Sequence, residues 1–176
     1  MITKLKRTPG LYLVGFMGCG KTTVGQALAA RLGWPFCDVD ERIEKAEGTT
    51  ISRIFEERGE PEFRRIESEA ILTCVRDIER GHPAVVALGG GAFAQENNRA
   101  LLAANGVTVW LDCPFEVVKR RVALAEHRPL ARDEEKFAAL YEARRAFYQQ
   151  ADYRVAIDGD DPSSPVEAIL AFPIFR

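Results

Sequence analysis

Residues 11–22 read LYLVGFMGCGKT, a short apolar run that leads into a glycine-rich turn ending in lysine and threonine. The turn matches the pattern G-x-x-x-x-G-K-[ST] from Gly15 to Thr22 at every fixed position. The apolar run predicts a buried strand, and the apolar residues 24, 28 and 32 predict a helix that begins near Lys21 and stops at Gly33. A strand, a turn of this kind and a helix together indicate a loop that binds the phosphates of a nucleoside triphosphate.

The residue types of this loop suit phosphate binding. Glycines let the backbone curl so that consecutive N–H groups point at phosphate oxygens, and the following helix adds the positive end of its dipole. Lys21 would reach the β- and γ-phosphates, and the Thr22 hydroxyl would bind Mg²⁺. We expect the contacts to come from these positions: Gly18, Cys19, Gly20, Lys21, Thr22 and Thr23. The alternative is a glycine-rich turn that binds nothing. Cys19 is interpreted as a replacement for another small residue, whose backbone matters more than its thiol.

The rest of the chain alternates apolar runs with helical patterns. Apolar runs predict further strands at residues 36–40, 84–88, 107–111 and 153–157. Helices are predicted at residues 42–80 with breaks near 48 and 59–61, at 97–105, 115–124 and 134–150, and from 163 or 164 onward. Apolar strands separated by helices are typical of a parallel sheet covered on both faces. We predict one α/β domain over residues 1–176, a three-layer sandwich with a five-stranded parallel sheet.

Composition and charge argue against several classes of protein. The 176 residues are 47% hydrophobic and 28% charged, which is ordinary for a globular domain. The formal net charge of −2 gives no general basis for binding nucleic acid or membrane. No apolar run approaches the roughly 20 residues of a membrane-spanning helix, and the N-terminal stretch does not fit a signal peptide. We expect a cytoplasmic monomer whose partner is a small molecule.

The four cysteines are Cys19, Cys37, Cys74 and Cys113. None of them forms a CxxC pair, and the two histidines lie far from them in the sequence, so a zinc site is not expected. Reduced and mostly buried thiols are the prediction.

Two acids close the strand predicted at residues 36–40. Asp38 and Asp40 alternate, so both side chains would point to one side of an extended backbone. Ligands of open α/β sheets bind beyond the carboxyl ends of the strands. There, one acid could serve Mg²⁺ through water, and the other could hold an acceptor hydroxyl and help to take its proton. The alternative is that these acids cap the next helix.

Two further features suit an acceptor molecule. Arg64 and Glu67 lie three residues apart on one helix face, so Glu67 could orient Arg64 for bidentate binding of a carboxylate. A solvated surface pair is the alternative. Gly89, Gly90 and Gly91 follow a predicted buried strand, where the lack of side chains permits close approach of a ligand.

Two basic segments could complete the site. Arg128 lies in a polar loop that we predict to be a mobile lid over residues 125–133. An arginine there can neutralise the transferring phosphoryl group, and the alternative is a solvated loop arginine. The helix predicted at residues 134–150 carries Arg144 and Arg145, and helical periodicity alone does not decide which of them faces the site.

Taken in order, these motifs resemble those of the shikimate kinases, which belong to the nucleoside-monophosphate-kinase-like group of P-loop NTPase folds. The matching segments are GFMGCGKTTVG at residues 15–25, DVD at 38–40, IFEERGEPEFRRIE at 54–67, LGGGA at 88–92, RPL at 128–130 and RRAFYQQAD at 144–152. The phosphate loop is widely shared, whereas GExxFRxxE combined with DxD and GGG is much more specific. The resemblance implies phosphoryl transfer from ATP, with Mg²⁺, to the 3-hydroxyl of shikimate in aromatic amino-acid biosynthesis.

The resemblance also implies a role for each matching residue on the nucleotide side. Lys21 and Arg128 would contact the phosphates, and Arg121 would lie near adenine. Thr22 and Asp38 would serve Mg²⁺.

On the acceptor side, Asp40 would hold the hydroxyls of shikimate and accept a proton, which makes it the third implied catalytic residue beside Lys21 and Arg128. A helical segment around residues 40–67 would bind the acceptor. The acceptor contacts implied are Asp40, Phe55, Phe63, Arg64, Gly89, Gly90, Gly91 and Arg144. Glu67 would orient Arg64. Arg144 is preferred to Arg145 because the family places its arginine four residues before the tyrosine matched by Tyr148.

The sequence departs from the family pattern at a few positions. Cys19 replaces a usual alanine, Thr22 a commoner serine and Ala146 a usual proline, and the segment 125–132 is compact. None of these changes removes a chemical group that the reaction needs. Two alternatives stay open, namely a kinase of similar fold that acts on gluconate or a nucleoside monophosphate, and a catalytically silent relative that binds ligands as a regulatory module.

Overall fold

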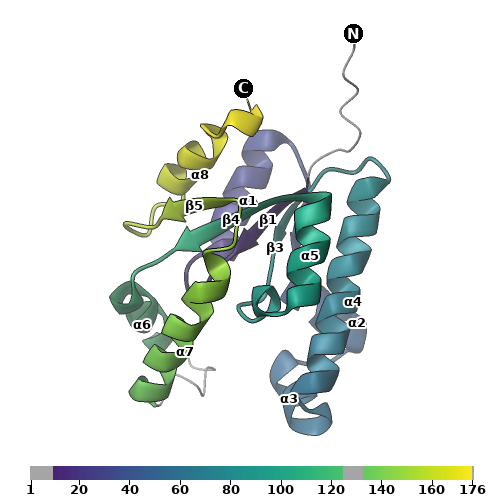
Figure 1. The fold of residues 1–176 in the computed structure, drawn as a ribbon, viewed down its shortest axis with the longest axis vertical. Coiled ribbons are helices and arrows are strands. Elements are labelled where there is room, and N and C mark those ends of the chain that lie inside the picture. The colour runs from purple at the N-terminus through teal and green to yellow at the C-terminus, as the bar shows by residue number, and fades with distance from the viewer. Residues whose placement is uncertain (1–9, 125–132, 176) are drawn as a thin grey trace.

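The computed structural model describes residues 10–124 and 133–175 (Figure 1). Its centre is a parallel sheet of five strands in the order β2-β3-β1-β4-β5. The strands are β1 (Gly10–Val14), β2 (Phe36–Asp38), β3 (Val85–Ala87), β4 (Gly106–Asp112) and β5 (Tyr153–Ala156). The predicted five-stranded parallel sheet is therefore confirmed.

The central strand β1 is buried along its whole length, as its unbroken apolar sequence requires. Its neighbours β3 and β4 pair with it on either side, so that Leu13 lies opposite both Ala87 and Val109. After β1 the chain passes to the edge strand β2, returns to β3 beside β1, and then crosses to β4 and β5 on the other side, so the connections change direction between β1 and β3. The crevice at such a switch point is the usual ligand site of an open α/β sheet.

Helices cover both faces of the sheet (Figure 1). They are α1 (Lys21–Leu32), α2 (Val39–Glu47), α3 (Ile51–Arg58), α4 (Glu60–Glu79), α5 (Glu96–Asn105), α6 (Phe115–Ala123), α7 (Glu134–Tyr148) and α8 (Ser163–Leu170), with 3₁₀ turns η1 (Ala92–Ala94) and η3 (Pro173–Phe175). Figure 1 shows α1 and α8 on one face and α4 with α5 on the other, while α3 and α7 flank the carboxyl edge of the sheet. None of the described helices is both long and apolar enough to cross a lipid bilayer.

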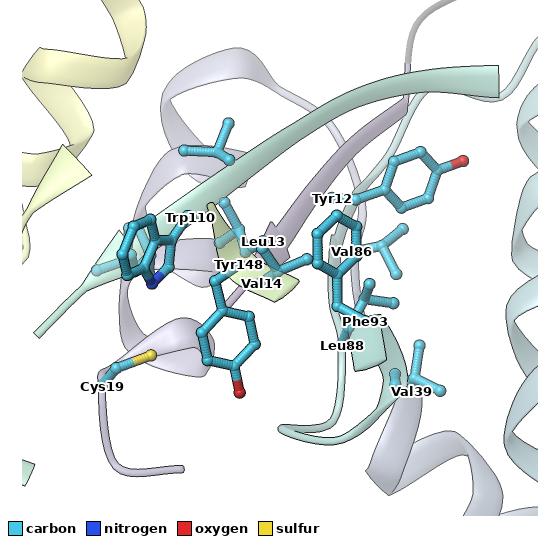
Figure 2. Close-up of a cluster of buried hydrophobic side chains, with 14 of the residues drawn as sticks. Tyr12, Leu13, Val14, Cys19, Val39, Val86, Leu88, Phe93, Trp110 and Tyr148 are labelled. Carbon is cyan, nitrogen blue, oxygen red and sulfur yellow. The ribbon is translucent and has the colours of Figure 1, made fainter. Parts of the chain in front are cut away.

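One hydrophobic core joins the layers, and Figure 2 shows part of it. Tyr148 from α7 reaches into this core beside Trp110 of β4, with ring centroids 6.1 Å apart. Both side chains are almost fully buried. The last turn of α7 is thereby fixed against the carboxyl end of the sheet, which determines where the preceding residues of α7 point.

The helix boundaries follow local capping. Thr50 caps α3, because its Oγ1 accepts a hydrogen bond from the Arg53 N–H at 3.2 Å. Gly33 ends α1 in the left-handed conformation, with φ of 67°. The predicted breaks near residues 48 and 59–61 are both present, since α2, α3 and α4 are separate helices.

The prediction that a strand runs to Asp40 is wrong. Strand β2 ends at Asp38, and α2 already begins at Val39. The cause is a helix cap, since Asp38 Oδ1 accepts a hydrogen bond from the Glu41 N–H at 3.2 Å. Asp38 and Asp40 therefore reach the same region from the end of a strand and the first turn of a helix, and not from alternate positions on one extended segment.

Candidate active site

A cavity of about 1170 Å³ lies beyond the carboxyl ends of β1, β2 and β3. It is bordered by the loop after β1, by the starts of α2 and α4, and by one face of α7. All of the predicted site residues that the structure describes line it: Gly18, Cys19, Gly20, Lys21, Thr22, Thr23, Asp38, Asp40, Phe55, Phe63, Arg64, Glu67, Gly89, Gly90, Gly91, Arg121 and Arg144. Arg128 and the lid expected at 125–133 lie outside the described residues, apart from the last lid residue, Asp133, which caps α7.

The loop between β1 and α1 has the backbone of an anion site. Gly18 and Gly20 adopt φ of 77° and 98°, which residues with side chains rarely adopt. Gly20 is directly followed by the first turn of α1, whose free N–H groups and dipole favour a bound anion. Lys21 folds back along the loop, where its Nζ donates to the carbonyl oxygens of Gly15 at 2.7 Å and Phe16 at 3.0 Å.

Thr22 and Asp38 bring two oxygen ligands together. The Thr22 hydroxyl donates to Asp38 Oδ2 at 2.8 Å, although the residues lie on α1 and at the end of β2. Mg²⁺ prefers oxygen ligands and usually takes few of them from the protein. The pair beside the phosphate loop therefore fits a magnesium ion.

Asp40 is a half-buried acid of the cavity. Its Oδ1 atom is shielded from solvent and has no hydrogen-bond partner among the described residues. Burial raises the pKa of the Asp40 carboxyl, and the neighbouring Asp38 carboxylate raises it further, against the opposing pull of Lys21. Such an unsatisfied acceptor in a cavity is poised to bind a donor that enters from outside, such as a hydroxyl group.

Arg64 is held by a buried carboxylate. Its Nη1 lies 2.8 Å from Oε1 of Glu67, and the Glu67 side chain is only 1% exposed. Burial raises the pKa of Glu67, although Arg64 opposes this rise. The guanidinium also lies 5.3 Å from the ring centroid of Phe63 and 6.0 Å from that of Phe55. A solvated surface pair, the alternative weighed above, does not describe this arrangement.

The three glycines after β3 make room for these charged groups. A Cβ atom on Gly89 would lie 2.7 Å from Oδ1 of Asp40, and one on Gly91 would collide with the guanidinium of Arg64. At Gly90 the nearest atom would be the backbone nitrogen of Met17, at 3.4 Å. The absence of side chains thus lets the end of β3 approach both Asp40 and Arg64.

Neighbouring arginines of α7 take different roles. Arg144 lines the cavity, where its Nη1 would lie 3.6 Å from a Cβ atom built on Gly90. Arg145 donates instead to Oδ1 of Asp112 at 2.7 Å, and its guanidinium lies 5.1 Å from the Trp110 ring. Asp112, an acid at the end of β4, thus holds Arg145 away from the cavity, and Arg144 faces it. Helical periodicity alone had not decided between the two arginines.

Arg121 of α6 lies on the nucleotide side of the cavity. It donates to the carbonyl oxygens of Gly18 at 3.1 Å and Gly159 at 3.0 Å, and it pairs with Asp160 at 2.9 Å. A wall here that no sequence pattern predicted is formed by residues 157, 159–162 and 165. It carries no recognised motif, so only the fold reveals it.

Comparisons with known proteins identify the family. The family model for shikimate kinase matches residues 17–172. A shikimate kinase of Persephonella marina is 43% identical over 164 residues, covering 91% of this chain and 96% of that protein. The structure of an Acinetobacter baumannii shikimate kinase in complex with shikimate has a TM-score of 0.85 at 37% identity, covering 92% of this chain and 90% of that one. A gluconokinase of Sinorhizobium meliloti shares only the fold, with a TM-score of 0.57 and 20% identity over 94% of this chain and 91% of that one. On this combined evidence, the chain belongs to the shikimate kinase family.

Proposed function

We propose that the chain transfers the γ-phosphoryl group of ATP to the 3-hydroxyl of shikimate, giving shikimate 3-phosphate and ADP in the aromatic amino-acid (chorismate) pathway. The single observation that carries this proposal is the acceptor half of the cavity. There, Arg64, Arg144 and Asp40 surround a space. The absence of side chains on the three glycines at 89–91 keeps that space open. Family membership supplies the identity of the acceptor.

Arg64 and Arg144 bind the carboxylate of the acceptor in this proposal. Arg64 is pre-oriented by the buried Glu67, so little side-chain entropy is lost when its guanidinium forms a bidentate contact. Arg144 approaches from α7 on the other side of Gly90. Arg144 lies near Glu67 and Tyr148, and its positive charge counteracts the rise in the pKa of both groups. Phe55 and Phe63 form the apolar wall against the carbon ring, and Gly90 offers a backbone N–H.

Asp40 holds the hydroxyls of the acceptor and receives the proton. Its unpartnered Oδ1 accepts a hydrogen bond from the reacting hydroxyl, and the raised pKa makes the carboxylate a better base than an exposed aspartate. A loose phosphoryl-transfer transition state needs little proton removal at its peak. The main contribution of Asp40 is therefore to aim the attacking oxygen.

The nucleotide-binding half of the cavity positions ATP and neutralises the charge of its phosphates. Gly18, Cys19, Gly20, Thr22 and Thr23 surround the phosphates, with Lys21 leaving its loop carbonyls to contact the β- and γ-phosphates. Arg121 lies near adenine, and Arg128 brings a further positive charge from the lid around 125–133. Thr22 and Asp38 would hold Mg²⁺, which would supply positive charge to offset the negative charge of the phosphates. Transfer is direct and in line, with no covalent enzyme intermediate.

The proposal also covers the domain organisation, the oligomeric state and the location of the protein. Residues 1–176 form one kinase domain whose acceptor-binding segment spans 40–67. The protein works as a cytoplasmic monomer on a small molecule, without nucleic acid or membrane.

The decisive experiment measures ADP production by the purified chain with Mg-ATP. Shikimate, gluconate and AMP are supplied as separate acceptors, and a reaction without acceptor gives the background ATPase rate. We expect strong stimulation by shikimate alone. Turnover with gluconate or AMP in place of shikimate would leave the proposed nucleotide-binding residues unaffected. It would contradict the proposal that Arg64 and Asp40 bind shikimate. Nucleotide binding without turnover on any acceptor would favour a silent, regulatory relative.

A further inference from the structure

Two cysteines that the proposed function does not use lie in contact. Cys37 Sγ at the middle of β2 is 3.5 Å from Cys74 Sγ on α4, although the residues are 37 positions apart in the sequence. Cys37 is half-buried, whereas Cys74 is 3% exposed. No other contact between cysteine sulfurs is found in the described part of the chain, and Cys19 and Cys113 are both buried.

An arginine spans this sulfur pair. Arg42 Nη1 lies 3.3 Å from Cys74 Sγ and 4.0 Å from Cys37 Sγ. Its Nη2 is held by Asp77 Oδ2 at 3.4 Å, so α2 and α4 fix the guanidinium over the pair. Strand β2 and helix α4 thus hold the two sulfurs at contact distance. The Arg42 guanidinium, from α2, donates hydrogen bonds to both of them.

We propose that Cys37 and Cys74 are a modification site, at which a hydroperoxide converts the two thiols into a reversible intrachain disulfide. Cys37, the more accessible thiol, attacks the peroxide oxygen; the O–O bond breaks, and the products are a sulfenic acid at Cys37 and water or an alcohol. The Cys74 sulfur then attacks the Cys37 sulfur, and the hydroxyl leaves as water. The two thiols are oxidised by two electrons, the peroxide is reduced by two, and a thiol reductant reverses the bond.

The geometry favours this chemistry at this pair over the other cysteines. The sulfurs need to approach from 3.5 Å to about 2.05 Å, which side-chain rotation and small backbone shifts can supply. The resolving thiol already touches the attacking thiol, so the sulfenic acid is captured before a second oxidant reaches it. A disulfide here links the middle of β2 to the C-terminal part of α4.

The bond would form next to the candidate active site. Cys37 directly precedes Asp38, whose carboxylate accepts the Thr22 hydroxyl at 2.8 Å. A displacement of β2 toward α4 would therefore move the ligand pair beside the phosphate loop. This consequence rests on the proposed function, whereas the disulfide itself does not.

The test reads the bond by mass and not by activity. The reduced full chain is treated with hydrogen peroxide, its remaining thiols are alkylated, and tryptic peptides are mapped. We expect loss of two of the four thiols, a crosslinked peptide pair containing Cys37 and Cys74, and full recovery of the thiols after dithiothreitol. Four intact thiols after peroxide, or a crosslink that joins other cysteines or two chains, would overturn the proposal.

Three variants sharpen the result. Cys37→Ser and Cys74→Ser are each expected to abolish the crosslink. Cys74→Ser leaves Cys37 with no resolving thiol, so its sulfenic acid should accumulate and take up dimedone at residue 37. Cys113→Ser is the matched control and should form the crosslink at the wild-type rate. Dimedone labelling at Cys19 or Cys113 in place of Cys37 would contradict the assignment, and circular dichroism checks that each variant is folded.

Discussion

Arg145 and Asp112 form an ion pair, with Arg145 Nη1 2.7 Å from Asp112 Oδ1, and this pair turns the adjacent Arg144 toward the cavity. The Asp112 side chain is 8% exposed and also accepts from Arg154 Nε at 2.7 Å. Trp110 packs beneath both guanidinium groups. The orientation of α7, and with it the acceptor site, depends on a buried carboxylate that no acceptor touches.

Removal of this anchor should destabilise the fold. Arg145→Ala leaves Asp112 buried with one partner, so we expect a loss of about 1–3 kcal/mol in the free energy of unfolding, measured in urea. Arg31→Ala is the matched control, because the Arg31 and Glu167 side chains are 55% and 61% exposed, and it should lose less than ~1 kcal/mol. Equal losses in the two variants would show that the Asp112 pair is no anchor.

Asp40→Asn should abolish most turnover while ATP binding stays near normal. Asn keeps the shape of the side chain but replaces an anionic acceptor with a neutral amide, which aims the attacking hydroxyl less firmly and cannot receive its proton. We therefore expect kcat to fall by ~10²-fold or more. Steady-state ADP production and nucleotide titration measure the two quantities. Asp158→Asn, at an exposed position outside the cavity, is the control. Wild-type turnover in Asp40→Asn would remove Asp40 from the mechanism.

The same substitution should raise stability in a pH-dependent way. Burial and Asp38 raise the pKa of Asp40, so the folded protein prefers the protonated acid, and ionisation of Asp40 costs stability. The penalty is absent at a pH below the ordinary aspartate range and grows as pH rises from there toward the raised pKa. Thermal unfolding from acidic to neutral pH should show Asp40→Asn gaining on the wild type as pH rises. A constant difference between the two curves would contradict this account.

Arg64→Ala should weaken acceptor binding far more than nucleotide binding. The change removes a buried contact to a carboxylate, so we expect a loss of roughly 2–5 kcal/mol in the binding free energy of shikimate. Isothermal titration calorimetry with each ligand gives both affinities. Arg64→Lys is the companion variant, because it keeps the charge next to Glu67 but cannot form a bidentate contact. Equal weakening for ATP and shikimate would argue against a carboxylate clamp.

The sequence predicted the sheet and the phosphate loop well, because both depend on local patterns. The resemblance to a family, and not a local pattern, pointed to the cavity-lining residues Phe55, Phe63, Arg121 and Arg144. A glycine-rich turn between an apolar strand and a helix has few other meanings, and Arg64 with Glu67 lies on one helical face by spacing alone. Local patterns of this kind were enough to place the phosphate loop after the first strand and to put Arg64 and Glu67 side by side on a helix.

Features that depend on tertiary contacts were harder to predict. The end of β2 was misplaced because an alternating DVD segment fits a strand as well as a capped helix start, and only the packing of α2 decides. Helical periodicity could not separate the adjacent Arg144 and Arg145. The family resemblance favoured Arg144, and the position of Asp112 gives the physical reason why Arg145 points elsewhere. The contact between Cys37 and Cys74 could not be predicted, because no sequence pattern relates two residues 37 positions apart.

The carboxylate of Asp38 has one further implication. One oxygen caps the helix α2 and the other accepts the Thr22 hydroxyl. One side chain thus serves both the start of a helix and the proposed Mg²⁺ site, so an Ala variant at this position would not distinguish a frayed helix start from the loss of a proposed metal ligand. Asparagine separates the two, since it caps helices about as well as aspartate but carries no charge. Loss-of-function data at position 38 are interpretable only with that substitution, and natural variation there must satisfy two unrelated demands at once.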